Sequence, residues 1–117
     1  MVALLLRAEW IAIWVAGVAL WFAQGGAVIW IIPALLAPDL SIAGYAAGPR
    51  IGAVVYNAVH NLVLALGLVG IGFLLASPLI LAGAILIAHI GMDRTSGFGL
   101  KYATSFQDTH LGRIGRS

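Results

Sequence analysis

The sequence predicts an all-α fold: a polytopic membrane helix bundle with about four transmembrane helices and a short interfacial helix. Of the 117 residues, 62% are hydrophobic and only 9% are charged, whereas soluble domains carry roughly 25% charged residues. Long apolar runs recur along the chain, separated by breaks that contain glycine and proline. A chain this short exposes much of its surface in any fold, so lipid must be the solvent for most of that surface.

Composition also excludes several classes of protein. The length allows one compact unit and no second domain. The absence of cysteine rules out disulfides, thiolate metal sites and cysteine nucleophiles. The basic residues are too few and too dispersed for a nucleic-acid-binding surface. The N-terminal segment lacks a leading basic region and a small-residue cleavage site, which predicts a retained helix rather than a cleaved signal.

The first two helices are predicted over residues 4–23 and 26–37. Trp10 and Trp21 lie near opposite ends of the first, where interfacial tryptophans anchor a spanning helix. The apolar part of the second covers roughly 17 Å of a hydrocarbon core of ~30 Å. It therefore either extends back into the preceding polar residues or stops inside the membrane, and Pro33 is expected to kink it.

A short interfacial helix is predicted over residues 40–47, with Asp39 as its N-cap. The third helix, over 50–76, is the longest, and the fourth, over 79–92, follows a Ser-Pro break. Two sets of small residues offer close approach to neighbouring helices. They are Gly67, Gly70 and Gly72 in the third helix, and Ala84 and Ala88 in the fourth.

The tail, residues 95–117, is predicted to lie in the cytoplasm. From Asp93 onward the basic residues Arg94, Lys101, Arg113 and Arg116 outnumber the acidic residues Asp93 and Asp108, and positive charge favours the cytoplasmic side. With an even number of spans, the N-terminus lies on the same side. Tyr102, Phe106 and His110 recur every four residues, which predicts an amphipathic interfacial helix within the tail.

Ionisable groups in or beside apolar helices are expensive, so each is a candidate site residue. The candidates are Glu9, Asp39, Arg50, His60, His89, Asp93 and Arg94, with Tyr56 and Asn57 as hydrogen-bonding neighbours. The predicted topology places the end of the second helix, the start of the third and the end of the fourth at one membrane face. If the third and fourth helices are antiparallel neighbours, His60 and His89 face each other in the cytoplasmic half of the bundle.

Three chemistries fit this set. Asp39, His60, His89 and Asp93 could hold a divalent metal ion, because two imidazoles and two carboxylates suit Zn or Mn/Fe. Haem between His60 and His89 is less favoured, because the depths of the two histidines need not match. A proton or ion path could use the same groups. In the structural alternative, Asp39 only caps a helix, Asp93 and Arg94 only mark the membrane boundary, and the remaining groups form an internal hydrogen-bond network.

Several motifs are similar to those of one family of small bacterial membrane proteins. They are the stretches 50–60, 88–94 and 97–102, the Pro38-Asp39-Leu40-Ser41 segment, and the closing residues Phe106, Thr109, His110, Leu111 and Gly112. On these motifs, the chain resembles the family catalogued as domain of unknown function 4260 and is identified as a member of it. This resemblance covers essentially the whole chain. It implies a four-helix membrane fold in the bacterial inner membrane and no particular activity.

A weaker resemblance is to bacterial inner-membrane proteins predicted to be metal-dependent hydrolases. The order of Pro38-Asp39, His60, and Ala88-His89 with Asp93 four residues on resembles theirs. Those proteins carry a second Asp after the Pro-Asp pair and a Thr-His-Ser element after the mid-chain His. This chain has Ser41 and Asn61-Leu62 at these places.

Three functional hypotheses follow. The first is a metal-dependent hydrolase for a lipid or other interfacial substrate, in which Arg50 or Arg94 meets an anionic headgroup; no residue is assigned as catalytic. The second is a non-enzymatic accessory or structural membrane protein, whose polar cluster is an internal network. The third is a small carrier or channel, which would need oligomerisation because one four-helix bundle has little room for a pore. The expected partners are the lipid bilayer and either further copies of the chain or a larger membrane complex.

Overall fold

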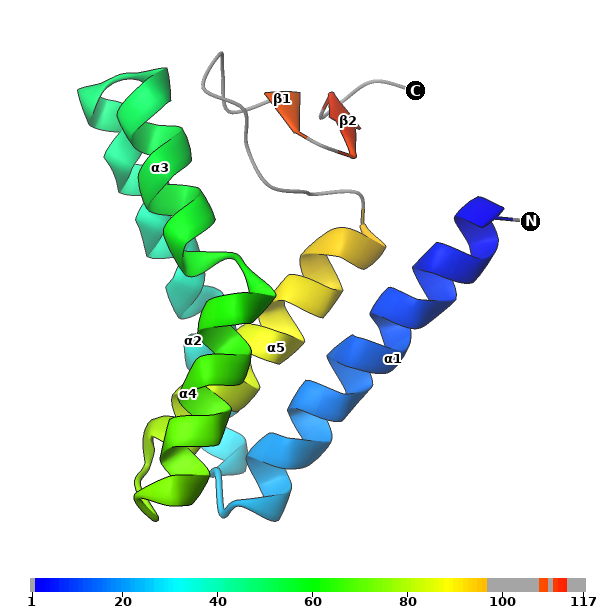
Figure 1. Ribbon diagram of the computed structural model, residues 1–117, viewed down its shortest axis with the longest axis vertical. Coiled ribbons are helices and arrows are strands. Elements are labelled where there is room, and N and C mark those ends of the chain that lie inside the picture. Colours follow the sequence, from blue (N-terminus) through cyan, green and yellow to red (C-terminus); the bar gives the residue numbers. More distant parts are fainter. Residues whose placement is uncertain (1, 97–107, 110, 114–117) are drawn as a thin grey trace.

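The computed structural model describes residues 2–96, 108–109 and 111–113. The helices are α1 (Val2–Ala23), α2 (Val28–Leu36), the 3₁₀ helix η1 (Ala37–Ala47), α3 (Pro49–Val59), α4 (Leu62–Leu74) and α5 (Leu79–Thr95). Two short antiparallel strands, β1 (Asp108–Thr109) and β2 (Gly112–Arg113), pair Asp108 with Arg113. The helices form one bundle (Figure 1), which confirms the predicted all-α fold class.

Among the described residues, three helical stretches are long and apolar enough to cross a membrane: Val2–Ala23, Val28–Ala47 and Pro49–Leu74. The chain runs down α1, up α2 and η1, down α3 and α4, and up α5, so α1 begins and α5 ends toward the same end of the bundle (Figure 1). Many large apolar side chains on α1 to α4 are exposed, including Leu4, Ile29 and Val63. Lipid is the solvent that suits such a surface.

The helix α5 is the central helix of the bundle and packs against α1, α2 and α4. It has 17 residues and is about 25 Å long. Every residue from Gly83 to Gly91 except Ile87 is buried. The predicted small-residue edge of this helix, Ala84 and Ala88, packs against α1 at Gly17. A Cβ added at Gly17 would lie 2.8 Å from the Ala84 carbonyl oxygen and nearer still to the Ala88 nitrogen. Because glycine has no side chain and alanine has only a methyl group, the two backbones can approach closely.

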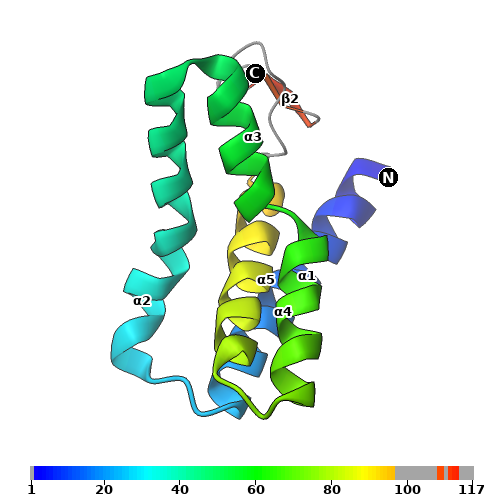
Figure 2. The ribbon, with the colours of Figure 1, turned by 60° about the vertical axis from the view of Figure 1, so that its left-hand side comes forward.

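The predicted third helix, over 50–76, is in fact interrupted at His60 and Asn61. Asn61 has extended backbone angles (φ −123°, ψ 146°), and its side-chain oxygen accepts a hydrogen bond from the Leu64 nitrogen at 2.8 Å. The same amide donates to the Asn57 and Ala58 carbonyls at 2.8 and 3.0 Å. One asparagine therefore closes α3 and caps α4. No proline or glycine marks this point in the sequence, and the polar residues Asn57, His60 and Asn61 were read as part of one helix. The break is visible in Figure 2.

The interfacial helix predicted over 40–47 is not a separate element. It is part of η1, which continues α2 directly and ends at Gly48, where φ is +110°. Together α2 and η1 cover about 35 Å, at roughly 1.5 Å per α-helical and 2.0 Å per 3₁₀ residue. By changing its helix type, the second segment therefore becomes long enough to cross the hydrocarbon core. Long 3₁₀ runs are uncommon, and this one packs side by side with α3, with Tyr45 against Gly52 (Figure 2).

Of the three glycines expected to offer close approach in the third helix, only Gly72 does so, against the backbone of Ile80. A Cβ added at Gly67 or Gly70 would meet nothing within 4 Å. The amphipathic tail helix predicted from Tyr102, Phe106 and His110 lies outside the described residues.

Candidate metal centre

Four of the predicted polar residues converge at one point in the bundle. Asp39 comes from the first turn of η1, His60 from the break between α3 and α4, and His89 and Asp93 from α5. Each offers one ligand atom, and these four atoms all lie within 4.8 Å of one another. Residues separated by up to 54 positions in the chain therefore share one site.

The size of this group matches a four-coordinate ion. The His60 and His89 Nε2 atoms are 3.1 Å apart, and the Asp93 Oδ2 atom lies 3.1 Å from His89 Nε2 and 3.9 Å from His60 Nε2. The Asp39 Oδ1 atom lies 3.2 and 3.5 Å from the same two nitrogens. Metal–ligand bonds of about 2.0–2.1 Å place tetrahedral ligands about 3.3–3.4 Å apart. The measured separations lie around this value.

The outer nitrogen of each imidazole is held by a backbone carbonyl. His60 Nδ1 lies 2.9 Å from the Tyr56 carbonyl oxygen, and His89 Nδ1 lies 2.6 Å from that of Leu35. A carbonyl can only accept, so each Nδ1 carries the proton and donates it. Each Nε2 then presents a lone pair to the centre, as in histidines that bind metals.

The centre therefore gathers four acceptor atoms, two imidazole nitrogens and two carboxylate oxygens. Acceptors this close repel one another, so the group requires positive charge, supplied by a metal ion or by additional protons. Haem does not fit, because two axial nitrogens on opposite sides of an iron would be about 4 Å apart, at roughly 2 Å per bond. Here the two Nε2 atoms are 3.1 Å apart, with carboxylates beside both.

Local sequence explains why the Leu35 carbonyl is free to accept from His89, and side chains satisfy the backbone groups at the break between α3 and α4. Pro38 has no N–H, so it cannot donate to the Leu35 carbonyl three residues earlier, as a 3₁₀ helix would otherwise require. That carbonyl accepts from His89 instead. At the break, the Leu64 nitrogen bonds to the Asn61 side chain, and the His60 carbonyl accepts from Arg94 Nη2 at 3.3 Å.

Further side chains position the ligands from outside. The Tyr56 hydroxyl donates to Asp93 Oδ2 at 3.3 Å, and its ring stacks on His60 with centroids 3.7 Å apart and planes 5° from parallel. The Ser41 hydroxyl donates to the Pro38 carbonyl at 2.8 Å and lies 3.4 Å from His60 Nδ1. These contacts fix the orientation of the His60 ring in particular.

Exposure differs among the four ligands. The side chains of His89 and His60 are 0% and 4% exposed, and that of Asp93 is 13% exposed. The Asp39 side chain is 42% exposed. The centre is therefore enclosed on the α5 side and open on the η1 side, where a water molecule or another ligand could reach it.

The remaining predicted site residues are divided between the centre and the surface. Tyr56 and Arg94 contact the ligands, as described, and the Asn57 carbonyl accepts from Asn61. Arg50 is exposed at the start of α3, roughly 15 Å along that helix from His60. Glu9 is exposed on α1.

Sequence reasoning missed three parts of this environment: the Leu35 carbonyl, the Ser41 hydroxyl and Trp10. Trp10 was expected to anchor and pack, and it also lies beneath Arg94, whose Cζ is 4.6 Å from the ring centroid. Pro38 was the available signal for Leu35, because a missing N–H leaves a carbonyl open.

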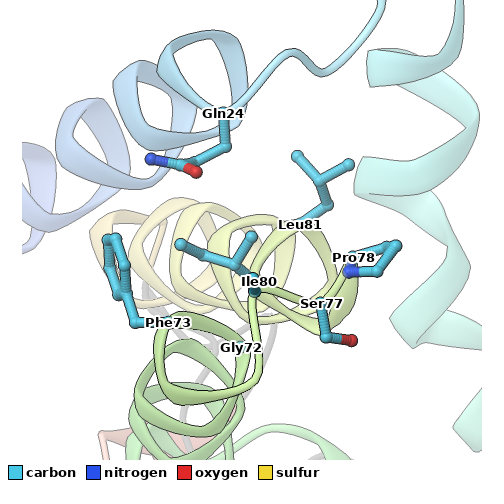
Figure 3. Close-up of a pocket in the computed structure, with 8 residues that line it drawn as sticks. Gln24, Gly72, Phe73, Ser77, Pro78, Ile80 and Leu81 are labelled. Atoms are coloured by element: carbon cyan, nitrogen blue, oxygen red, sulfur yellow. The ribbon is translucent and has the colours of Figure 1, made fainter.

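A cavity of about 450 Å³ lies between the end of α1 and the turn that joins α4 to α5 (Figure 3). Its lining residues are Gln24, Gly72, Phe73, Ala76, Ser77, Pro78, Ile80 and Leu81. None of these side chains is titratable or a common metal ligand, so this cavity offers no acid–base or metal chemistry.

Replacing Tyr56 with phenylalanine should weaken metal binding by about 10-fold or more, because outer-shell partners of metal ligands typically contribute 10–100-fold. The ring stacking on His60 is retained in this variant, so the change removes the hydroxyl, and with it the hydrogen bond to Asp93, without removing the ring. Competition with a chromogenic chelator measures the affinity. An unchanged affinity would show that the hydroxyl does not support the centre.

Comparison with curated proteins and with solved structures found no match to this chain. A family model does match, over residues 3–114, which is nearly the whole chain. The matched stretch includes all four residues of the candidate metal centre. The chain therefore belongs to the family described as Domain of unknown function (DUF4260).

Proposed function

We propose that this protein is a metal-dependent membrane hydrolase whose centre holds one divalent ion, Zn or Mn/Fe, between Asp39, His60, His89 and Asp93. The observation that carries the proposal is the convergence of four acceptor atoms within 4.8 Å of one another, with both imidazole protons directed outward. An internal network of neutral groups would instead alternate donors with acceptors.

Hydrolysis is the reaction class that best suits such an ion. A bound divalent metal supplies Lewis acidity and lowers the pKa of a coordinated water. The chain contributes the orientation of the ligands through Tyr56, Leu35 and Ser41. Asp39 supplies the open side at which a substrate could approach. The order of the four ligands also resembles that of inner-membrane proteins predicted to be metal-dependent hydrolases.

The proposed location is the bacterial inner membrane, with both termini in the cytoplasm. Two observations support this orientation: α1 begins and α5 ends toward the same end of the bundle (Figure 1), and basic residues are in excess from Arg94 onward. The centre would then be reached from the cytoplasmic half of the bilayer.

Metal analysis of the purified chain in detergent tests the proposal. We expect about one Zn, Mn or Fe per chain after purification without chelator, removal by EDTA, and recovery on adding the ion back. Hydrolysis of short-chain chromogenic esters and phosphate esters should follow the metal content. Protein that takes up none of these ions after EDTA treatment and repletion would contradict the proposal.

The second candidate is a non-enzymatic membrane protein with a protonated internal network. The completeness of the outer hydrogen bonds favours it, because the Leu35, Tyr56 and Ser41 contacts hold the cluster in place without chemistry. If the metal-free protein unfolds at the same temperature as protein supplied with metal, the chain belongs to this non-enzymatic class.

A further inference from the structure

A small pocket lies where α1 begins and α5 ends. It has a volume of about 220 Å³ and is lined by Ala3, Leu6, Arg7, Trp10, Arg94 and Leu111. Four of these residues form one face of α1, because positions 3, 6, 7 and 10 follow the helical repeat. The pocket thus combines an apolar strip with two guanidinium groups.

Arg94 is held in a defined position at this pocket. Its Cζ lies 4.6 Å from the Trp10 ring centroid, and Nη2 donates to the His60 carbonyl at 3.3 Å. A guanidinium has five N–H donors in a rigid plane. Among the described residues, one of these donors bonds to His60, so the group retains donors for a ligand.

Arg7 adds a second positive charge on the same face of α1. The nearest acidic residue in sequence, Glu9, lies about 200° further around the helix. Within the described part of the chain, no carboxylate lies within ion-pair distance of Arg7 or Arg94. The pocket therefore carries net positive charge that a bound anion could neutralise.

We infer that Arg7 and Arg94, with Trp10 supporting Arg94, bind the phosphate headgroup of a membrane amphiphile. Two guanidiniums suit phosphate, because their planar donors match its oxygens in bidentate geometry. The volume is below the roughly 300 Å³ at which pockets for whole drug-sized ligands begin, so it suits a headgroup whose chains remain in lipid. Leu6 is exposed beside the arginines and could contact those chains.

The pocket borders the candidate metal centre. Arg94 follows the ligand Asp93 directly, and its hydrogen bond reaches the backbone of the ligand His60. If the chain is a metal-dependent hydrolase, on which this step rests, its substrates are phosphate-bearing lipids positioned by these two arginines. Headgroup binding itself requires no metal and can be measured separately.

The test is calorimetric titration of the full chain in dodecylmaltoside, after EDTA treatment, with dihexanoyl phosphatidic acid. Dihexanoylglycerol, which has the same chains and no phosphate, is the matched ligand. We expect the phosphatidic acid to bind and the diacylglycerol not to bind. Arg7→Gln and Arg94→Gln should each weaken binding by about tenfold or more, since each removes charge-assisted hydrogen bonds to the phosphate.

Arg50→Gln is the control for general loss of positive charge, because Arg50 is exposed and does not line the pocket; its affinity should match the wild type. Arg94→Lys keeps the positive charge but lacks the planar donors, so its affinity for phosphatidic acid should fall several-fold. An equal loss in Arg50→Gln, or equal binding of diacylglycerol, would overturn the inference. Inorganic phosphate binding as tightly as the lipid would overturn the assignment to an amphiphile.

Metal content measured on the same preparations separates this inference from the proposed function. Stoichiometric metal without phosphatidic acid binding would reject the headgroup pocket alone. Phosphatidic acid binding in a chain that takes up no metal would support the pocket and reject the metal-dependent reaction.

Discussion

Replacing His89 with alanine should abolish stoichiometric metal binding and lower metal affinity by more than about 100-fold. Loss of an outer-shell partner alone typically reduces affinity 10–100-fold, and His89 supplies a ligand atom. Its Nε2 lies within 3.2 Å of three other ligand atoms, and its side chain is fully buried. No neighbouring described side chain can replace that nitrogen, because the other members of the cluster already face the centre.

Thermal unfolding in detergent, with and without added metal, measures this loss independently of activity. At a metal concentration 100 times the Kd, binding stabilises the wild type by about 2.7 kcal/mol. The His89→Ala variant should show no metal-dependent rise in Tm.

Ile90→Ala is the matched control for the loss of packing. Ile90 is 1% exposed and is adjacent to His89 in sequence, so its truncation should destabilise the chain by about 2–5 kcal/mol. It should nevertheless keep the metal-dependent rise in Tm. A rise of wild-type size in His89→Ala would exclude His89 as a ligand and favour an internal hydrogen-bond network.

Adding one methyl group at Gly17 should destabilise the bundle, by about 1–3 kcal/mol, as overpacking of a close contact does. A Cβ there would come within 3 Å of the α5 backbone at Ala84 and Ala88. Backbone atoms cannot rotate away as a side chain can, so α1 and α5 would have to separate. Since α5 carries His89 and Asp93, metal affinity should also fall.

Gly67→Ala is the same substitution on a helix face with no neighbour within 4 Å. It should be neutral or stabilise by up to about 1 kcal/mol, because alanine has the higher helix propensity. Unfolding by SDS titration compares the two variants. Equal effects at Gly17 and Gly67 would show that α1 and α5 do not pack as closely as described.

The sequence alone determined the class of the protein and the identity of the candidate ligands. A low fraction of charged residues and long apolar runs require lipid as solvent, and lipid requires backbone groups to be paired within helices. In such a setting each ionisable group stands out, so Asp39, His60, His89 and Asp93 were recognisable as candidates. Ala84 and Ala88 likewise indicated the packing face of the last helix.

Only the tertiary structure decided how these residues meet. Within 50–76 no proline or glycine stands at the break that turns His60 inward. The capping role of Asn61 depends on the folded backbone around it. The change of α2 into the 3₁₀ helix η1, which packs against α3, was also not indicated by the sequence pattern. The proton positions on the two imidazoles depend on the Leu35 and Tyr56 carbonyls. The pairing of Leu35 with His89 joins residues 54 positions apart, and a local pattern contains no information about such a contact.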